Sequence, residues 1–295
     1  MHQPGPVRLF LLLTLAIAAV SCGSIFVRLA AAPALAVAAY RVAWATILFA
    51  PVLMSGPARE LAPLPRKEWG WLLLSGTALA FHFALWIASL SYTSVASSVL
   101  LVDTTPFFIG LASQWLLKRP CPRLFWIGLA VAFLGCVVIF RGDWSQAEVT
   151  MKGNVLALAG ALAMAIYLLV GGRVRRSLSL IAYVWPVYGS AALVLFAACL
   201  ASGTPLRGYS PATYGYMFLL GLIPQCIGHT TYNWSLRWLS PALVALIGLA
   251  EPVGASLLAY VVLREGLTLG KLVGGGVVLF GIYLATRPDH AASAE

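Results

Sequence analysis

The chain has 295 residues, of which 61% are hydrophobic and only 9% are charged, and its mean hydropathy is +0.91. Soluble domains carry about 25% charged residues, so this composition excludes an ordinary soluble protein. The formal net charge is +10, but the cations lie in short breaks between apolar runs, a pattern that argues against a nucleic-acid partner. The five cysteines have no metal-ligand spacing, and we expect neither a metal nor a cofactor.

Apolar runs long enough to cross a bilayer follow one another along the chain. A span needs about 20 apolar residues, and polar or proline breaks separate ten such runs. The first begins like a signal peptide, but it continues past Cys22 to about Ala32 and is interpreted as a span rather than a cleaved leader. The predicted spans cover residues 8–30, 34–54, 68–91, 94–117, 123–140, 153–172, 180–201, 212–236, 240–263 and 268–286.

The distribution of Lys and Arg predicts how these spans are oriented. When the breaks are assigned alternately to two sides, the side that holds both termini carries 12 Lys and Arg residues and the other side carries six. Cytoplasmic loops carry an excess of these residues. We therefore expect both termini, including a tail at residues 288–295, to lie in the cytoplasm.

Landmark residues of the first half recur 146 positions later, which indicates a duplication. The duplicated unit contains five spans. Because five is an odd number, the second copy enters the membrane in the opposite orientation to the first. The sequence therefore predicts an all-α membrane protein with ten transmembrane helices, arranged as two inverted five-helix repeats around a central cavity. The repeats are expected at residues 1–141 and 151–287. The recurring landmarks are Ser94 and Ser240, Pro106 and Pro252, Gly128 and Gly274, and Gly135 and Gly281.

A few ionisable residues lie deep within the predicted spans. Such groups are costly in a bilayer and by default face the bundle interior or water, where they are candidates for function. At 1.5 Å per residue, Asp103 and Glu251 lie near the middle of the fourth and ninth spans. His82, His229 and Arg41 lie in the third, eighth and second spans. We predict that these five residues line a substrate cavity.

Aromatic and amide side chains at helical spacing accompany these groups and complete the predicted site. Trp86 shares a helix face with His82, Tyr232 and Asn233 lie with His229, and Tyr40 neighbours Arg41, while Trp185 is a further candidate. Each candidate also has a purely structural interpretation. The acids can be neutralised by neighbours, the histidines can be hydrogen-bonded in the core, the aromatics can face lipid, and Arg41 can extend outward to anchor its span.

Proline and glycine residues mark candidate helix breaks beside the two acids. Pro106 and Pro252 cannot donate to the carbonyls of Val102 and Gly248, four residues earlier, and such free carbonyls can bind a cation or an ammonium group. Gly248 and Gly254 lie with Glu251 in a stripe of small residues, where helices approach closely or a ligand contacts backbone.

The second half contains the segments LSPALVALI (239–247), Glu251-Pro252 and LREGL (263–267), followed by Gly274 and Gly281. Together with the duplicated five-span pattern, these segments resemble the EamA-type transporters of the drug/metabolite transporter superfamily, and within it the YddG-like amino-acid exporters of bacterial inner membranes. The resemblance covers essentially the whole chain. The first copy is a looser match, with Lys118-Arg119-Pro120 where the second has Arg264-Glu265-Gly266.

The resemblance implies that spans 1 to 4 and 6 to 9 surround a cavity, that spans 5 and 10 brace the outside, and that transport proceeds by alternating access. The leading hypothesis is a secondary transporter, not an enzyme, that exports amino acids or similar small metabolites across the bacterial inner membrane. Its partners are a small-molecule substrate and membrane lipid, with protons as a candidate coupling ion. Alternatives are a cationic drug or polyamine exporter and, from another class, an intramembrane enzyme or a lipid flippase.

Overall fold

The computed structural model describes residues 4–141, 150–264 and 266–287, and all regular structure within these ranges is helical. The predicted tail at 288–295 lies outside them. The first half contains α1 (Pro6–Ser21), α2 (Gly23–Ala30), α3 (Ala34–Met54), α4 (Ala58–Leu61), α5 (Arg66–Ser89), α6 (Val95–Val102), α7 (Thr105–Trp115) and α8 (Arg123–Phe140). The second contains α9 (Met151–Val174), α10 (Leu180–Ser202), α11 (Pro211–Leu220), η2 (Gly221–His229), α12 (Thr230–Ser235), α13 (Pro241–Gly248), α14 (Glu251–Leu263) and α15 (Leu269–Thr286).

The ten predicted spans correspond to these helices. Within the described residues, nine continuous or slightly broken helices are long and apolar enough to cross a membrane. The remaining predicted span, 212–236, is formed by α11, η2 and α12 in unbroken succession, and its central nine residues have the wider π-helical winding. Pro224 lies within that stretch, where its missing N–H removes one of the bonds of an ordinary α-helix. The expectation of an all-α membrane protein is confirmed.

The recurring serines begin equivalent helices in the two halves. The Ser94 hydroxyl accepts a hydrogen bond from the backbone N–H of Ser97 at the start of α6, over 2.9 Å. The Ser240 hydroxyl accepts one from the N–H of Leu243 at the start of α13, over 3.2 Å. Each serine thereby satisfies a backbone donor that a helix N-terminus leaves free.

The other landmarks also have equivalent structural roles. Pro106 and Pro252 each occupy the second position of a helix, in α7 and α14, where a proline is tolerated because the first turn needs no N–H donor. Lys118 and Arg264, also 146 residues apart, both have a left-handed backbone, with φ of 52° and 56°. Equivalent positions therefore carry equivalent backbone geometry.

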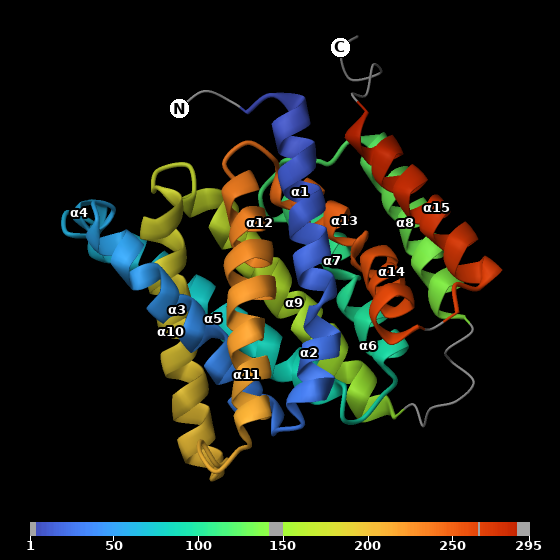
Figure 1. Ribbon diagram of the computed structural model, residues 1–295. Coiled ribbons are helices and arrows are strands. Elements are labelled where there is room, and N and C mark those ends of the chain that lie inside the picture. Colours follow the sequence, from blue (N-terminus) through green and yellow to red (C-terminus); the bar gives the residue numbers. More distant parts are fainter. Residues whose placement is uncertain (1–3, 142–149, 265, 288–295) are drawn as a thin grey trace.

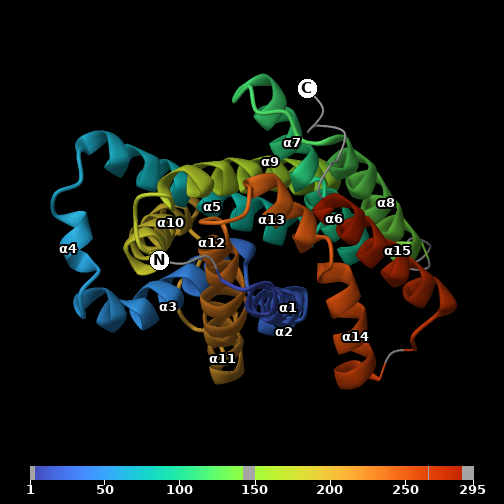
Figure 2. The ribbon, with the colours of Figure 1, turned by 90° about the horizontal axis from the view of Figure 1, so that it is seen from above.

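The fifth helices of the two halves, α8 and α15, pack side by side in opposite directions along one edge of the molecule (Figures 1 and 2). A Cβ atom added to Gly128 would lie 2.4 Å from the carbonyl oxygen of Gly281, and one added to Gly135 would lie 2.7 Å from that of Gly274. Because Gly128 matches Gly274 and Gly135 matches Gly281 in the repeat, the two contacts interchange under a two-fold rotation. A pseudo-two-fold axis therefore passes between these helices.

The second helices of the two halves, α3 and α10, are antiparallel as well. Tyr40 near the start of α3 contacts Phe196 towards the end of α10, with ring centroids 5.9 Å apart, whereas Phe49 further along α3 contacts Tyr188, earlier in α10, at 6.4 Å. Equivalent helices thus run in opposite directions, and the two halves are inverted. In agreement with an even number of spans, α1 begins and α15 ends at the same end of the bundle (Figure 1).

Candidate functional site

A cavity of about 80 Å³ lies at the centre of the bundle, between the two halves. A single water needs about 10–15 Å³ on this measure, so the cavity has room for several. Side chains from α1, α3, α5, α6, α7, α9, η2, α12, α13 and α14 line it, whereas α8, α10 and α15 contribute none of the described lining residues. Nine of the 14 predicted site residues line the cavity: Arg41, His82, Trp86, Asp103, Pro106, His229, Tyr232, Gly248 and Glu251.

The two carboxylates reach the cavity from breaks in two equivalent spans. Asp103 follows the last residue of α6, and Glu251 is the first residue of α14 after the break at residues 249–250. Asp103 is buried, and its Oδ2 atom has no hydrogen-bond partner among the described residues. Both acids line this one cavity. The cavity wall thus contains one carboxylate oxygen that the described protein does not satisfy.

Arg41 brings a cation to the same cavity. Its side chain is only 2% exposed, its Nε atom donates to Oε1 of Gln225 over 2.9 Å, and its guanidinium carbon lies 3.9 Å above the centroid of the Phe83 ring. The only ion pair within the described ranges joins Arg173 and Glu68. Arg41 and Glu251 line the same cavity without forming an ion pair within 4.0 Å, so no described carboxylate neutralises the charge of Arg41 by direct contact.

The two histidines lie close together although they come from different halves, with ring centroids 6.4 Å apart. Nδ1 of His82 lies 3.0 Å from the carbonyl oxygen of Gly160. A carbonyl only accepts, so Nδ1 carries the hydrogen, and the Nε2 atom of the neutral ring is an acceptor. Nδ1 of His229 is buried without a partner in the described part of the chain. The pair therefore offers hydrogen-bonding capacity to a ligand or to water.

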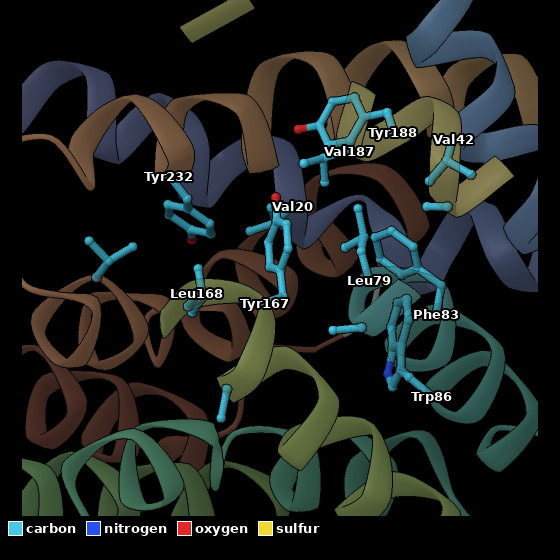
Figure 3. Close-up of a cluster of buried hydrophobic side chains, with 14 of the residues drawn as sticks. Val20, Val42, Leu79, Phe83, Trp86, Tyr167, Leu168, Val187, Tyr188 and Tyr232 are labelled. Carbon is cyan, nitrogen blue, oxygen red and sulfur yellow. The ribbon is translucent and has the colours of Figure 1, made fainter. Parts of the chain in front are cut away.

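Aromatic rings cover a large part of the cavity wall. The rings of His82 and Trp86 are stacked, 6.2 Å apart and 4° from parallel, and Phe83 meets His229 edge-on at 5.3 Å. Figure 3 shows the rings of Phe83, Trp86 and Tyr232 directed into the space between the helices. Val20, Met164 and Leu168 add aliphatic surface. The cavity thus combines a few charged groups with an apolar wall, as small-molecule sites do.

Five predicted site residues do not line the cavity. The Asn233 amide donates to the hydroxyl of Tyr167 and, over 2.8 Å, to the carbonyl of His229, so it supports the helix behind the wall. The Tyr40 hydroxyl donates to the Leu206 carbonyl over 2.6 Å. Trp185 lies on α10, which contributes no described side chain to the cavity. The remaining two are Pro252 and Gly254, and a Cβ on Gly254 would lie 2.3 Å from the Ser21 hydroxyl oxygen.

The carbonyls expected to be free beside the prolines differ from each other. The Val102 carbonyl accepts a hydrogen bond from the Thr105 hydroxyl over 2.7 Å, which occupies one of its two lone pairs. Gly248 itself lines the cavity, and a Cβ added there would meet nothing within 4 Å. Backbone at the second break is therefore open to a ligand.

Two residues beside Arg41 were not among the predicted site residues. Phe83 carries no charge and resembles any other core aromatic, so its contact with Arg41 leaves no sequence signal. Gln225 does leave one, because it is a polar amide inside an apolar span, four residues before His229. Extending the search for costly intramembrane groups from ionisable side chains to amides would have found it.

Two inverted five-helix halves that enclose a polar cavity at their interface define a membrane transporter with its binding site between the repeats. The chain belongs to the EamA-like transporter family, whose sequence model matches residues 8–141 and 151–287. It is 25% identical over 260 residues to the Bacillus subtilis (strain 168) uncharacterized transporter YwfM, covering 83% of this chain and 85% of that one. It is 26% identical over 204 residues to the Escherichia coli (strain K12) uncharacterized inner membrane transporter YedA, covering 67% and 64%.

A solved crystal structure shares the fold. It aligns with a TM-score of 0.78 at 19% sequence identity and covers 96% of this chain and 97% of that chain. At this identity the match extends to the arrangement of helices and not to the ligand. The substrate therefore has to be argued from the cavity.

Proposed function

We propose that this transporter exports zwitterionic amino acids, or similar small amphiphilic metabolites, across the bacterial inner membrane by alternating access, with both termini in the cytoplasm. The observation that carries the proposal is the presence of an unpaired cation, Arg41, and two acids, Asp103 and Glu251, in the wall of one small cavity. A zwitterion has complementary charges at short separation and can satisfy both signs at once.

Each part of an amino acid has a counterpart in the cavity. Guanidinium groups bind carboxylates through paired N–H donors, so the substrate carboxylate is assigned to Arg41. The ammonium group is assigned to Asp103 and Glu251, beside the open backbone at Gly248. The apolar side chain is assigned to Trp86 and the neighbouring rings, which stabilise it by burying its surface.

The inverted repeat supports the alternating-access mechanism. When equivalent helices run in opposite directions, exchanging the conformations of the two halves converts a cavity open to one side into a cavity open to the other. The name of the E. coli relative, an inner membrane transporter, supports the location. The driving force is then the substrate gradient or a coupled flux of protons, for which the two carboxylates are the candidate carriers.

Uptake into proteoliposomes tests the proposal. We expect purified protein to transport amino acids with apolar side chains above the rate of protein-free liposomes. The Arg41→Gln variant, which removes the cation, is expected to lower this uptake by at least about tenfold, equivalent to about 1.4 kcal/mol. Background uptake of a broad amino-acid panel by the folded wild-type protein would refute the proposal.

Export of cationic drugs or polyamines is a second candidate, because the cavity contains two acids and only one arginine. The two candidates predict different effects of Glu251→Gln. If the protein is a cation exporter, this variant loses cation binding. Such a protein does not bind zwitterions, so the substitution has no effect on them. An amino-acid transporter keeps the interaction between the substrate carboxylate and Arg41, so its zwitterion binding weakens without disappearing.

A further inference from the structure

We infer that Gln225 is a positioning residue for substrate selection: its neutral amide holds Arg41 in place while leaving the full positive charge of Arg41 to a substrate carboxylate. The inference deepens the proposed function and rests on it, because it specifies which feature makes the cavity select carboxylate-bearing ligands. It concerns a residue that does not itself line the cavity.

The guanidinium of Arg41 is fixed from two sides. Gln225 accepts from Nε over 2.9 Å, and the face of Phe83 lies 3.9 Å from the guanidinium carbon. Arginine has five N–H donors, four of them on the two terminal nitrogens. No described residue accepts a hydrogen bond from these four. With Nε and one face of the plane occupied, the terminal pair is left for a ligand in the cavity that Arg41 lines.

The orientation of the Gln225 amide follows from hydrogen-bond chemistry. Nε of Arg41 can only donate, so the amide atom that faces it is the oxygen. The amide nitrogen of Gln225 is consequently turned away, and it is buried without a partner among the described residues. The orientation of the amide is therefore set by its contact with Arg41.

The neutrality of this side chain is as important as its position. A glutamate has nearly the same shape and would accept from Arg41 equally well, but it would form an ion pair with it. That pair would neutralise the charge and compete with a substrate carboxylate for the guanidinium. An amide provides the same geometry without the competition.

The π-helical stretch brings Gln225 to Arg41. Gln225 lies in the middle of η2, and at the start of η2 the backbone of Gly221 packs directly on α3. A Cβ on Gly221 would lie 2.6 Å from Cβ of Trp44 and 2.9 Å from the carbonyl oxygen of Arg41 itself. The two helices are therefore in close contact beside the residue that Gln225 holds.

The test compares two ligands that differ by one carboxylate, leucine and isoamylamine, in direct binding to the full-length protein in detergent. We expect Gln225→Glu to lower leucine affinity by at least about tenfold and to leave isoamylamine affinity unchanged or higher. Gln225→Leu, which keeps the charge of Arg41 but releases Nε, is expected to lower leucine affinity by a smaller factor. Gln114→Glu adds the same negative charge at an exposed position of α7 and is the matched control, with an unchanged affinity ratio.

The ratio of the two affinities separates a positioning role from a structural one, because a general loss of folded protein lowers both affinities together. A folded Gln225→Glu variant with the wild-type ratio would overturn the inference and leave the proposed function intact. If Gln225→Glu does not fold, the ratio in Gln225→Leu decides in the same way. Wild-type protein that binds isoamylamine but not leucine would overturn the proposed function and this inference with it.

Discussion

At the scale of single residues, the cavity wall holds charged groups that lack contact partners in the described chain. Asp103 has an unsatisfied carboxylate oxygen, and the terminal nitrogens of Arg41 have no acceptor. Unpaired charges in a low-dielectric environment destabilise a protein. Such residues are retained where a ligand or water completes their interactions. At these positions the protein has a lower folding stability than it could have, and the residues serve function instead.

Gly248 offers a way to fill the cavity without disturbing the fold. We expect Gly248→Leu to lower substrate binding by at least about tenfold, because its side chain would project into the space where a Cβ now meets nothing within 4 Å. Gly248→Ala is the control and is expected to be neutral or slightly stabilising, because its methyl group would meet nothing within 4 Å and alanine is the better helix former. Equilibrium binding and thermal unfolding in detergent measure the two effects. Wild-type affinity in a folded Gly248→Leu protein would show that ligands bind elsewhere.

At the scale of the elements, four of the spans that line the cavity are interrupted, whereas α3, α5 and α9 reach it as continuous helices. The fourth and ninth spans break at residues 103–104 and 249–250, the first breaks at Cys22, and the eighth becomes π-helical at 221–229. Each break leaves backbone groups without regular helical partners or changes the direction of a side chain. The bracing helices α8 and α15 are continuous. Irregular backbone therefore occurs in several of the spans that line the cavity and in neither bracing helix.

The contact between α8 and α15 depends on glycine at the crossing points. A Cβ on Gly281 would lie 2.4 Å from the backbone nitrogen of Ala132, so Gly281→Ala should force the helices apart and destabilise the protein by roughly 1–3 kcal/mol. Gly276→Ala, in the same helix but with nothing within 4 Å of its Cβ, should be neutral or slightly stabilising. Unfolding free energies in detergent compare the two. Equal effects would mean that the crossing does not depend on close backbone contact.

At the scale of the whole molecule, the backbone is nearly two-fold symmetric but the site is not. The positions equivalent to Arg41 and Asp103 in the other half are Val187 and Leu249, and the position equivalent to Glu251 is Thr105. By contrast, Trp86 and Tyr232 are equivalents at the exact offset of 146 and the histidines are near-equivalents at 147, so the asymmetry lies in the charged groups. In the proposed mechanism, the symmetric scaffold would serve alternating access, and the asymmetric charges would give the substrate the same orientation in both states.

Cysteine labelling tests the inverted topology in a membrane. Ser55 follows α3 and Ser202 ends α10, both are exposed, and these antiparallel helices place them at opposite ends of the bundle. In a functional cysteine-free background, we expect Ser55→Cys to react with a membrane-impermeant maleimide only after the cells are opened. Ser202→Cys should react in intact cells. Labelling of both from the same side would contradict the inverted arrangement.

Much of the architecture can be predicted from the sequence, because it depends on the length of each apolar segment and on the number of segments in the duplicated unit. A bilayer requires about 20 apolar residues per helix, and an odd number of spans in a duplicated unit requires inversion. The landmarks that revealed the duplication, such as Ser94 and Gly128, are residues whose backbone roles few other types can fill. Charged residues deep in the spans were expected near the cavity for the same reason: few places in a membrane tolerate them.

What only the tertiary structure decided is which side of each helix faces the cavity. Asn233 is one helical turn after His229, and Trp185 is the same residue type as Trp86, yet Asn233 forms its hydrogen bonds behind the cavity wall and Trp185 lies on a helix that contributes no described lining residue. Arg41 and Gln225 are 184 positions apart in the sequence, and no local spacing links them. Rotation of a helix about its axis is determined by packing against its neighbours, and in an apolar span nearly every face is hydrophobic, so the sequence contains little information about that rotation.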